Sequence, residues 1–261
     1  MRTFRDRILA KAKRVLLSNS LILILFKLWN IKKEQFTCPI CRYQGPFVEM
    51  HPETGIRKHA ACPKCSSLER HRLQFLVIDN LAERFDLSKM SILHFAPEKF
   101  LQDYFKKLFK QYTSADLVMK NVDYQADLLN LPFEDDTYDF VFASHVLEHI
   151  KDDTRALSEI YRILRPNGIA VLPVPIIAYK TVEYPQPNPY ESGHVRSTGP
   201  DYFEKYSLYF NKVETFDSND FSIKYQIFTY EDRACFPTVN MPLRPAMAGD
   251  KHLDIVPVCF V

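Results

Sequence analysis

Short apolar runs alternate with amphipathic segments over most of the chain. Helical periodicity marks residues 67–85, 99–110, 154–164 and 200–209, and Asp152 or Asp153 is suited to cap the third of these. Six runs have the length and composition of buried strands: residues 91–96, 111–115, 138–144, 169–174, 212–216 and 253–261. Strands that alternate with helices predict an α/β fold with a parallel sheet covered on both faces.

Residues 1–34 differ from this pattern, because a basic stretch precedes an apolar one. The apolar run at 15–29 is interrupted by polar residues and is too short for a spanning helix, which needs about 20 apolar residues. Two hypotheses remain for this helical segment. It packs on its own domain, or it lies on the inner face of a membrane with its basic residues against anionic lipid.

Two proline-rich stretches, 183–200 and 232–252, fit neither strand nor helix. Both are longer than ordinary connections, which makes the first a candidate lid or substrate loop. The role of the second stays open.

Four cysteines form two C-x-x-C pairs, and two more cysteines stand alone. Cys38 and Cys41 are separated by 20 residues from Cys62 and Cys65, a spacing typical of a zinc ribbon. Four thiolates fill a tetrahedral site, so we predict a structural Zn(II) in a module at 35–67, within a reducing compartment such as the cytoplasm. An iron or iron–sulfur site, a redox pair and free thiols are the alternatives.

Composition excludes the disordered and fibrous classes. The chain has 261 residues, of which 46% are hydrophobic and 25% charged. A net charge of +2 shows no basic excess of the kind that nucleic-acid binding usually requires.

Acidic residues follow the first two strands of the α/β region. Asp116 ends the second strand, 18 residues after Glu98, and in nucleoside-binding α/β folds an acid at this place accepts hydrogen bonds from ribose hydroxyls. Asp127 follows 11 residues later.

The stretch "DLLNLPFEDDTYDFVFASHVLEHIKDDTRALSEIYRILRPNGIAVLPVPI", residues 127 to 176, resembles the class I S-adenosylmethionine-dependent methyltransferases of type 11. The resemblance rests on an "LPF" turn, an "HVLEH" strand end and a final "RPNG" turn, and it extends more loosely from Ser91 to the C-terminus. Two features depart from the family: "HFAPE" replaces the glycine-rich first motif, and Asn167-Gly168 replaces a pair of glycines.

The resemblance implies a Rossmann-like, seven-stranded, mostly parallel sheet over residues 90–261, joined to the zinc module by a helix at 68–89. It places S-adenosylmethionine against Phe95, Ala96, Glu98, Asp116, Asp127, Leu128, Ser144 and His145. His145 and His194 are candidate catalytic bases, and Arg196 in the same loop is a candidate grip for the acceptor. His149 is expected to cap the strand end or to be solvated.

These observations predict a methyltransferase for a small-molecule or glycan-like acceptor, with peripheral membrane contact through residues 1–30. An rRNA or tRNA methyltransferase with a zinc module is the second hypothesis, although nucleic acid is the less favoured partner. The third is a non-catalytic binding protein with a degenerate cofactor pocket.

Overall fold

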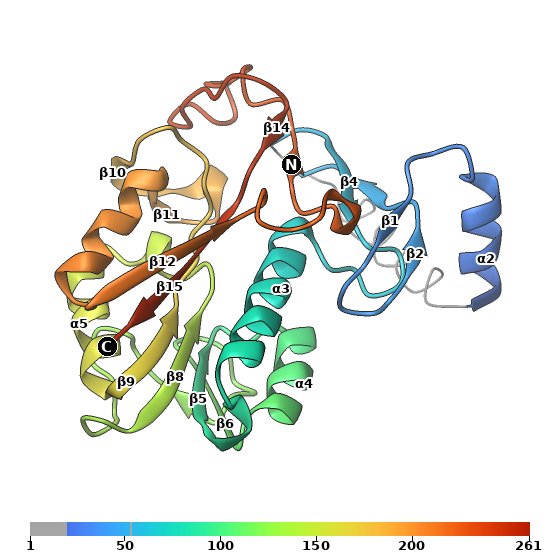
Figure 1. Ribbon diagram of the computed structural model, residues 1–261. Helices are drawn as coiled ribbons and strands as arrows, with labels where there is room; N and C mark the ends of the chain where they lie inside the picture. The colour runs from blue at the N-terminus through green and yellow to red at the C-terminus, as the bar shows by residue number, and fades with distance from the viewer. Residues whose placement is uncertain (1–19, 53) are drawn as a thin grey trace. The chain divides into compact units, whose positions relative to one another are not determined.

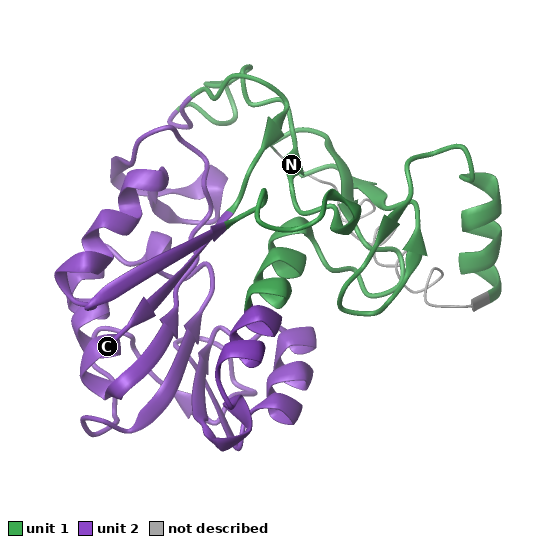
Figure 2. Ribbon diagram, viewed as in Figure 1, with its two compact units in different colours: residues 1–77, 217–242, 246–254 green, residues 78–216, 243–245, 255–261 purple. Residues whose placement is uncertain are grey.

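The computed structural model describes residues 20–52 and 54–261, so the predictions for residues 1–19 lie outside the described residues. The chain forms two compact units, which are described separately (Figure 2). Unit 1 comprises residues 1–77, 217–242 and 246–254, and unit 2 comprises residues 78–216, 243–245 and 255–261. Neither unit is one continuous stretch of the sequence.

Unit 1 contains short strands and few helices. Helix α2 (Ser20–Trp29) precedes a small hairpin of β1 (Phe36–Thr37) and β2 (Gln44–Gly45). A second sheet has the order β14-β13-β4-β3, formed by β3 (Val48–Met50), β4 (Arg57–Ala61), β13 (Thr229–Tyr230) and β14 (Lys251–His252), with a 3-10 turn η5 at Ile223–Tyr225. Helix α3 (Glu69–Arg84) starts in this unit.

Buried Arg72 joins two of the three sequence segments of unit 1. Its guanidinium donates to the main-chain oxygens of Ala60 and Ser67 in the cysteine block, and to those of Tyr225 and Gln226 in the later segment. The Arg72 side chain is fully buried, so these carbonyls compensate a charge that burial alone would make costly. Segment 217–242 is therefore part of the unit that holds the cysteines.

Unit 2 is built on a seven-stranded sheet in the order β12-β15-β9-β8-β5-β6-β7 (Figure 1). Strands β5 to β9 pair in parallel, and β15 pairs with β9 antiparallel. The strands are β5 (Ser91–Phe95), β6 (Gln111–Asp116), β7 (Tyr124–Gln125), β8 (Tyr138–Ala143), β9 (Leu164–Val171), β12 (Lys212–Asp217) and β15 (Ile255–Phe260). The predicted seven-stranded, mostly parallel α/β sheet is confirmed.

Alternating side chains bury both faces of this sheet. Leu93, Val141 and Ala170 occupy paired positions and pack in one cluster with α5 (Asp153–Ile163) and the 3-10 helix η4 (Pro200–Leu208). His94 and Phe142, one register position away, contact Phe105 of α4 (Lys99–Leu108). Helices therefore cover opposite faces, as the sequence predicts.

Asp152 caps α5 as expected, because its carboxylate accepts a hydrogen bond from the Arg155 amide.

One whole segment differs from the prediction, and several elements begin or end at other residues than expected. The segment predicted as a long loop at 183–200 instead forms a hairpin of β10 (Val182–Asn188) and β11 (His194–Ser197). Proline has no amide N–H to donate. It is compatible with these strands because they pair only with each other, so each strand has one unpaired edge where no donor is needed. Short 3-10 turns complete the unit: η1 (Leu87–Lys89), η2 (Leu147–His149) and η3 (Pro189–Glu191).

Within residues 20–52 and 54–261, every helix is too short or too polar to span a membrane.

Candidate functional site

The carboxyl ends of β6, β5 and β8 lie next to one another at one edge of the sheet. Strand β5 pairs with β6 on one side and β8 on the other, and the chain reverses its direction of winding between β5 and β8. Ligands of open α/β sheets bind at this kind of switch point. Neighbouring strands are about 4.8 Å apart, so the three strand ends fall within about 10 Å.

The turn after β5 is tight although it contains no glycine. Ala96 has φ 48°, and its amide donates a 3.0 Å hydrogen bond to the Ala115 oxygen at the end of β6. The left-handed conformation costs a non-glycine residue about 1 kcal/mol. The Phe95 side chain is buried in the hydrophobic core, so this residue offers only its main chain to a ligand, while half-buried Glu98 begins α4 as its N-cap.

Asp116 organises the loop that follows β6. One carboxylate oxygen, Oδ1, accepts hydrogen bonds of 2.7 Å from the amides of both Val118 and Met119. These bonds fix the carboxylate at the strand end and engage only one of its two oxygens. Asp116 is half-buried, and the apolar side chains of Leu117, Val118 and Met119 are exposed beside it.

Asp127 and Leu128 lie in a turn beyond β7. The Asp127 Oδ1 accepts from the Leu129 amide at 2.9 Å, and the carboxylate is exposed to solvent. Leu128 is 3% exposed and packs in the core, which anchors the turn.

Ser144 and His145 follow β8 directly. His145 has φ 55°, and its amide donates to the Pro173 oxygen at 2.9 Å. Its Nδ1 lies 3.5 Å from Oε1 of Glu148, a residue that is 1% exposed. The structure thus brings one predicted catalytic histidine close to a buried carboxylate that sequence analysis did not single out.

His194 approaches the same carboxylate from β11. Its Nε2 lies 3.9 Å from Glu148 Oε1, and its ring meets the His149 ring edge to face at 4.8 Å. Burial lowers the pKa of His194 to about 4, with the nearby histidines and Arg244 acting in the same direction and Glu148 opposing it. The imidazole is therefore neutral at pH 7.

Arg196 does not face an acceptor, in contrast to the prediction. Its side chain is 1% exposed and donates to the main-chain oxygens of Leu147, Ile150 and Lys151. It also bonds the Glu183 carboxylate at 2.9 Å and lies 3.4 Å from Asp153. Arg196 is a positioning residue that clamps the corner around η2 against β11.

The four paired cysteines converge in unit 1. Their Sγ atoms lie within 4.8 Å of one another, with Cys38 and Cys65 at 3.6 Å and Cys41 and Cys62 at 3.5 Å. Hydrogen bonds from Cys41, Cys62 and Cys65 hold the pKa of the Cys38 thiol well below its usual value, whereas the bond with Cys38 raises that of Cys62. The cluster therefore favours at least one thiolate.

Both C-x-x-C turns have the same backbone geometry. The Cys38 amide bonds the Tyr43 oxygen and the Arg42 amide bonds the Cys38 oxygen; the Cys62 amide and oxygen make the same two bonds with Ser67 and Ser66. Arg42 and Ser66 both have φ near 60°. Each turn thus aims its pair of sulfurs toward one point.

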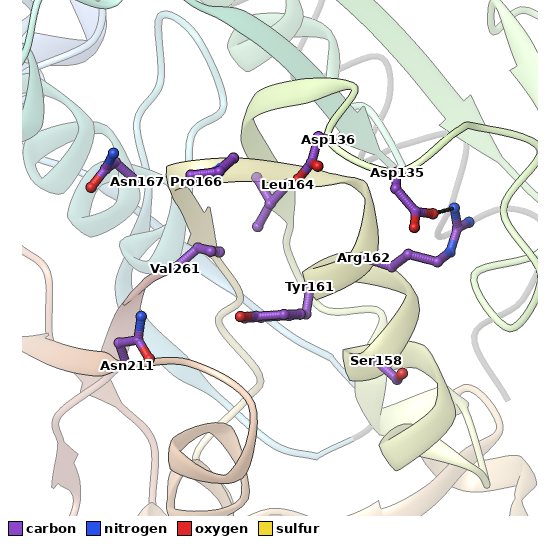
Figure 3. Close-up of a pocket in the computed structure, with 10 residues that line it drawn as sticks. All are labelled: Asp135, Asp136, Ser158, Tyr161, Arg162, Leu164, Pro166, Asn167, Asn211 and Val261. Atoms are coloured by element: carbon purple, nitrogen blue, oxygen red, sulfur yellow. Dashed lines mark hydrogen bonds and ion pairs between the residues drawn. The ribbon is translucent and has the colours of Figure 1, made fainter.

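A separate pocket of ≈ 650 Å³ lies at the opposite edge of the sheet (Figure 3). It adjoins the starts of β8 and β9, and the ion pair between Arg162 and Asp135 crosses one side of it at 2.8 Å. None of the predicted cofactor residues lines it.

Relatives with curated names match only part of the chain. The demethylmenaquinone methyltransferase of Streptomyces avermitilis is 46% identical over 18% of this chain and 20% of its own length. That of Staphylococcus epidermidis is 28% identical over 47% of this chain and 42% of its own length. The chain thus spans 20% of the length of the first relative and 42% of the length of the second. The solved structure of Burkholderia thailandensis 1,6-didemethyltoxoflavin-N1-methyltransferase has a TM-score of 0.49 and 14% identity, over 74% of this chain and 77% of that one.

The family comparison covers the part of the chain that carries the predicted cofactor residues. It includes β5, β6, β8 and β9, together with the turns that follow the first three of these strands. Residues 89–172 match the family Methyltransf_11, described as a methyltransferase domain.

Proposed function

We propose that the protein is an S-adenosylmethionine-dependent methyltransferase for a small-molecule acceptor. The observation that carries this proposal is the placement of Ala96, Asp116 and His145 at the carboxyl ends of three adjacent parallel strands, within the segment that matches a methyltransferase domain. The relatives named as demethylmenaquinone methyltransferases support a small-molecule acceptor and make quinone-type compounds the first to test.

The residues at this edge fit a nucleoside ligand. Asp116 keeps one carboxylate oxygen on loop amides, and its other oxygen is suited to accept from ribose hydroxyls. Asp127 is exposed and suited to accept from an exocyclic amine, next to the apolar anchor Leu128. A sulfonium cofactor carries no phosphate, so this turn needs no glycine-rich cradle of amides.

When bound, S-adenosylmethionine supplies an electrophilic methyl group, and transfer breaks its S–C bond as the acceptor forms a new bond to the carbon. The protein's task is to align the acceptor with that carbon and to exclude water. We assign this task to Ser144 and His145, which directly follow β8. His145 or His194 takes the acceptor's proton, and Glu148 stabilises the imidazolium that results.

Calorimetry with S-adenosylmethionine tests the cofactor site, with Asp116→Ala and Asp127→Ala as variants. Binding by the wild type and weaker binding by both variants is expected, and a folded wild type that does not bind would favour the non-catalytic alternative. Incubation of labelled cofactor with cell fractions then identifies the acceptor. Label in quinones or other small molecules supports the proposal, label in a lipid-linked glycan shifts it to the glycan-like acceptor, and label in RNA replaces it with the second hypothesis.

We further propose that the cysteine cluster holds a structural Zn(II). At a Zn–S length of about 2.3 Å, sulfurs at tetrahedral corners are about 3.8 Å apart, close to the separations of 3.5 Å and 3.6 Å. Four thiolates leave no position for a reacting ligand. The metal then stabilises unit 1 and takes no part in methyl transfer.

We also propose that α2 brings the protein to a membrane surface. Leu21, Ile24, Leu25 and Leu28 lie at helical spacing and are each more than half exposed, and Lys27 interrupts the apolar stretch. Flotation with vesicles that contain anionic lipid tests this contact. Leu25→Glu should reduce binding, whereas Val239→Glu, at an exposed apolar residue outside α2, should not.

A further inference from the structure

Three side chains around the corner after β8 have the composition of a metal site that is distinct from the cysteine cluster. Glu148 and His149 belong to η2, and His194 is the first residue of β11. Their potential ligand atoms all lie within 4.8 Å of one another. His145 stands at the edge of this group, with its Nδ1 3.5 Å from the Glu148 carboxylate.

The separations are longer than hydrogen bonds and close to those of ligands that share an ion. A contact of 3.9 Å between His194 Nε2 and Glu148 Oε1 is too long for a hydrogen bond. Ligands at about 2.0 to 2.2 Å from a tetrahedral ion are about 3.3 Å from one another. A small inward movement of these side chains thus suffices to close the site.

The burial and the chemical types of these side chains also suit a metal site. Glu148 is 1% exposed, and buried carboxylates are stabilised by paired charges or by metal coordination. The His194 ring is half-buried, and its Nε2 lies on the side of Glu148. Among the described residues, Nδ1 of this ring has no hydrogen-bond partner.

The corner is held rigidly, as a binding site requires. Arg196 lies two residues after His194 on β11 and donates hydrogen bonds of 2.7 Å to the oxygens of Leu147 and Ile150, on either side of the two η2 ligands. One side chain thereby fixes both chain segments that supply ligands. His149 is exposed, which leaves the opposite side of the site open to a further ligand.

The positive charge of Arg244 acts on His194 and opposes a bound cation. Arg244 contributes to the lowered pKa of His194, but its Nε lies 3.9 Å from a carboxylate oxygen of Glu191. The Glu191 carboxylate therefore offsets part of the Arg244 charge.

We propose that Glu148, His149 and His194 bind one divalent transition-metal ion, with His145 next to it. A set of two imidazoles and one carboxylate suits Zn²⁺, Mn²⁺ or Fe²⁺ and leaves positions for exogenous ligands. Metal binding does not depend on the proposed methyl transfer, but the role of the metal does. With an ion bound, Glu148 and His194 are its ligands and the ion replaces the histidine base. It binds an acceptor hydroxyl and lowers its pKa, and the proton passes to water before the oxygen takes the methyl group.

Metal titration of the full chain, already loaded with zinc at the cysteines, tests the site. Mn²⁺ binding followed by electron paramagnetic resonance and Zn²⁺ binding followed by calorimetry should each show one additional ion per chain. His149→Ala, His194→Ala and Glu148→Gln should each weaken this binding at least tenfold. The matched control is His51→Ala, because His51 is exposed beside Glu49 and far in sequence from the site.

Two results would overturn the proposal: no additional ion of either metal in the folded wild type, or unchanged affinity in folded variants. His149 is exposed, so His149→Ala should fold even where His194→Ala does not, and circular dichroism checks this. S-adenosylmethionine binding, measured with the metal removed by a chelator, tests the methyltransferase proposal separately from the metal-site proposal. Metal binding without any methyl transfer supports the metal site and refutes the proposed methyltransferase activity. Methyl transfer without metal binding refutes the metal site and supports the methyltransferase activity.

Discussion

The guanidinium of Arg196 donates a 2.7 Å hydrogen bond to the main-chain oxygen of Leu147, although 49 residues separate the two. This bond, with those to Ile150 and Lys151, holds the corner that carries Glu148 and His149. After the end of β8, where the predicted acceptor site begins, these main-chain oxygens thus accept hydrogen bonds from a buried guanidinium.

Loss of Arg196 should destabilise unit 2 strongly. Arg196→Met removes the donors to three carbonyls and leaves Asp153 without one of its charged partners, so we expect the free energy of unfolding to fall by about 3 to 5 kcal/mol. Denaturant unfolding measures it. Arg165→Ala, which removes a partly exposed ion pair with Asp139, is the control and should cost about 1 kcal/mol or less.

The turn after β5 should tolerate glycine better than a branched residue. Ala96→Gly relieves the left-handed strain but increases the entropy of the unfolded chain, so thermal stability should change by less than about 1 kcal/mol. Ala96→Val should destabilise the protein by more than about 1 kcal/mol and weaken S-adenosylmethionine binding. Equal melting temperatures for the two variants would contradict this account of the turn.

Two substitutions of Asp116 should separate its role in forming the loop from its role in binding the cofactor. Asp116→Asn retains an oxygen for the Val118 and Met119 amides, so stability should be preserved, while loss of the charge weakens cofactor binding about tenfold. Asp116→Ala removes both contributions and should lower stability as well. Calorimetry and thermal unfolding of the same two variants measure the two effects, and full affinity in Asp116→Asn would argue against a ribose contact.

Removal of zinc should affect unit 1 selectively. We expect one zinc per chain at the cysteines by elemental analysis, and Cys65→Ser or a strong chelator should expose residues 35–67 to proteolysis. Cys235→Ser is the matched control, because Cys235 is an exposed cysteine outside the cluster. Protease resistance that survives complete metal removal would count against a structural metal.

Acid should destabilise the protein through His94, which lies 1% exposed in the core. Burial lowers the pKa of His94 to about 3, with Glu98 opposing the shift. The unfolded chain binds a proton near pH 6.5, so the stability is complete above that pH and is lost as the pH falls from 6.5 toward 3. Between pH 7 and 5 the loss is about 2 kcal/mol. Denaturant unfolding of wild type and His94→Leu checks this, since the variant should lack this part of the pH dependence.

The local patterns of the sequence determined the sheet and the cysteine site. Strands β5 and β8 are buried on both faces, so each reads as a mainly apolar run that the sequence pattern can identify. The C-x-x-C pairs are recognisable because a turn of this kind is specified within a few residues. The wrong prediction of a loop at 183–200 arose because prolines are evidence against an internal strand, and here the hairpin pairs only with itself.

Only the tertiary structure decided which distant residues meet. Nothing local to Glu148, His194 or Arg196 indicates that one carboxylate, two strand ends and a buried guanidinium share a corner, because their contacts span more than 40 residues of sequence. The same holds for Arg72, which joins segment 217–242 to the cysteine block through main-chain oxygens that carry no sequence signal. Periodicity encodes which face of an element is buried, whereas the path of the chain determines what lies against it.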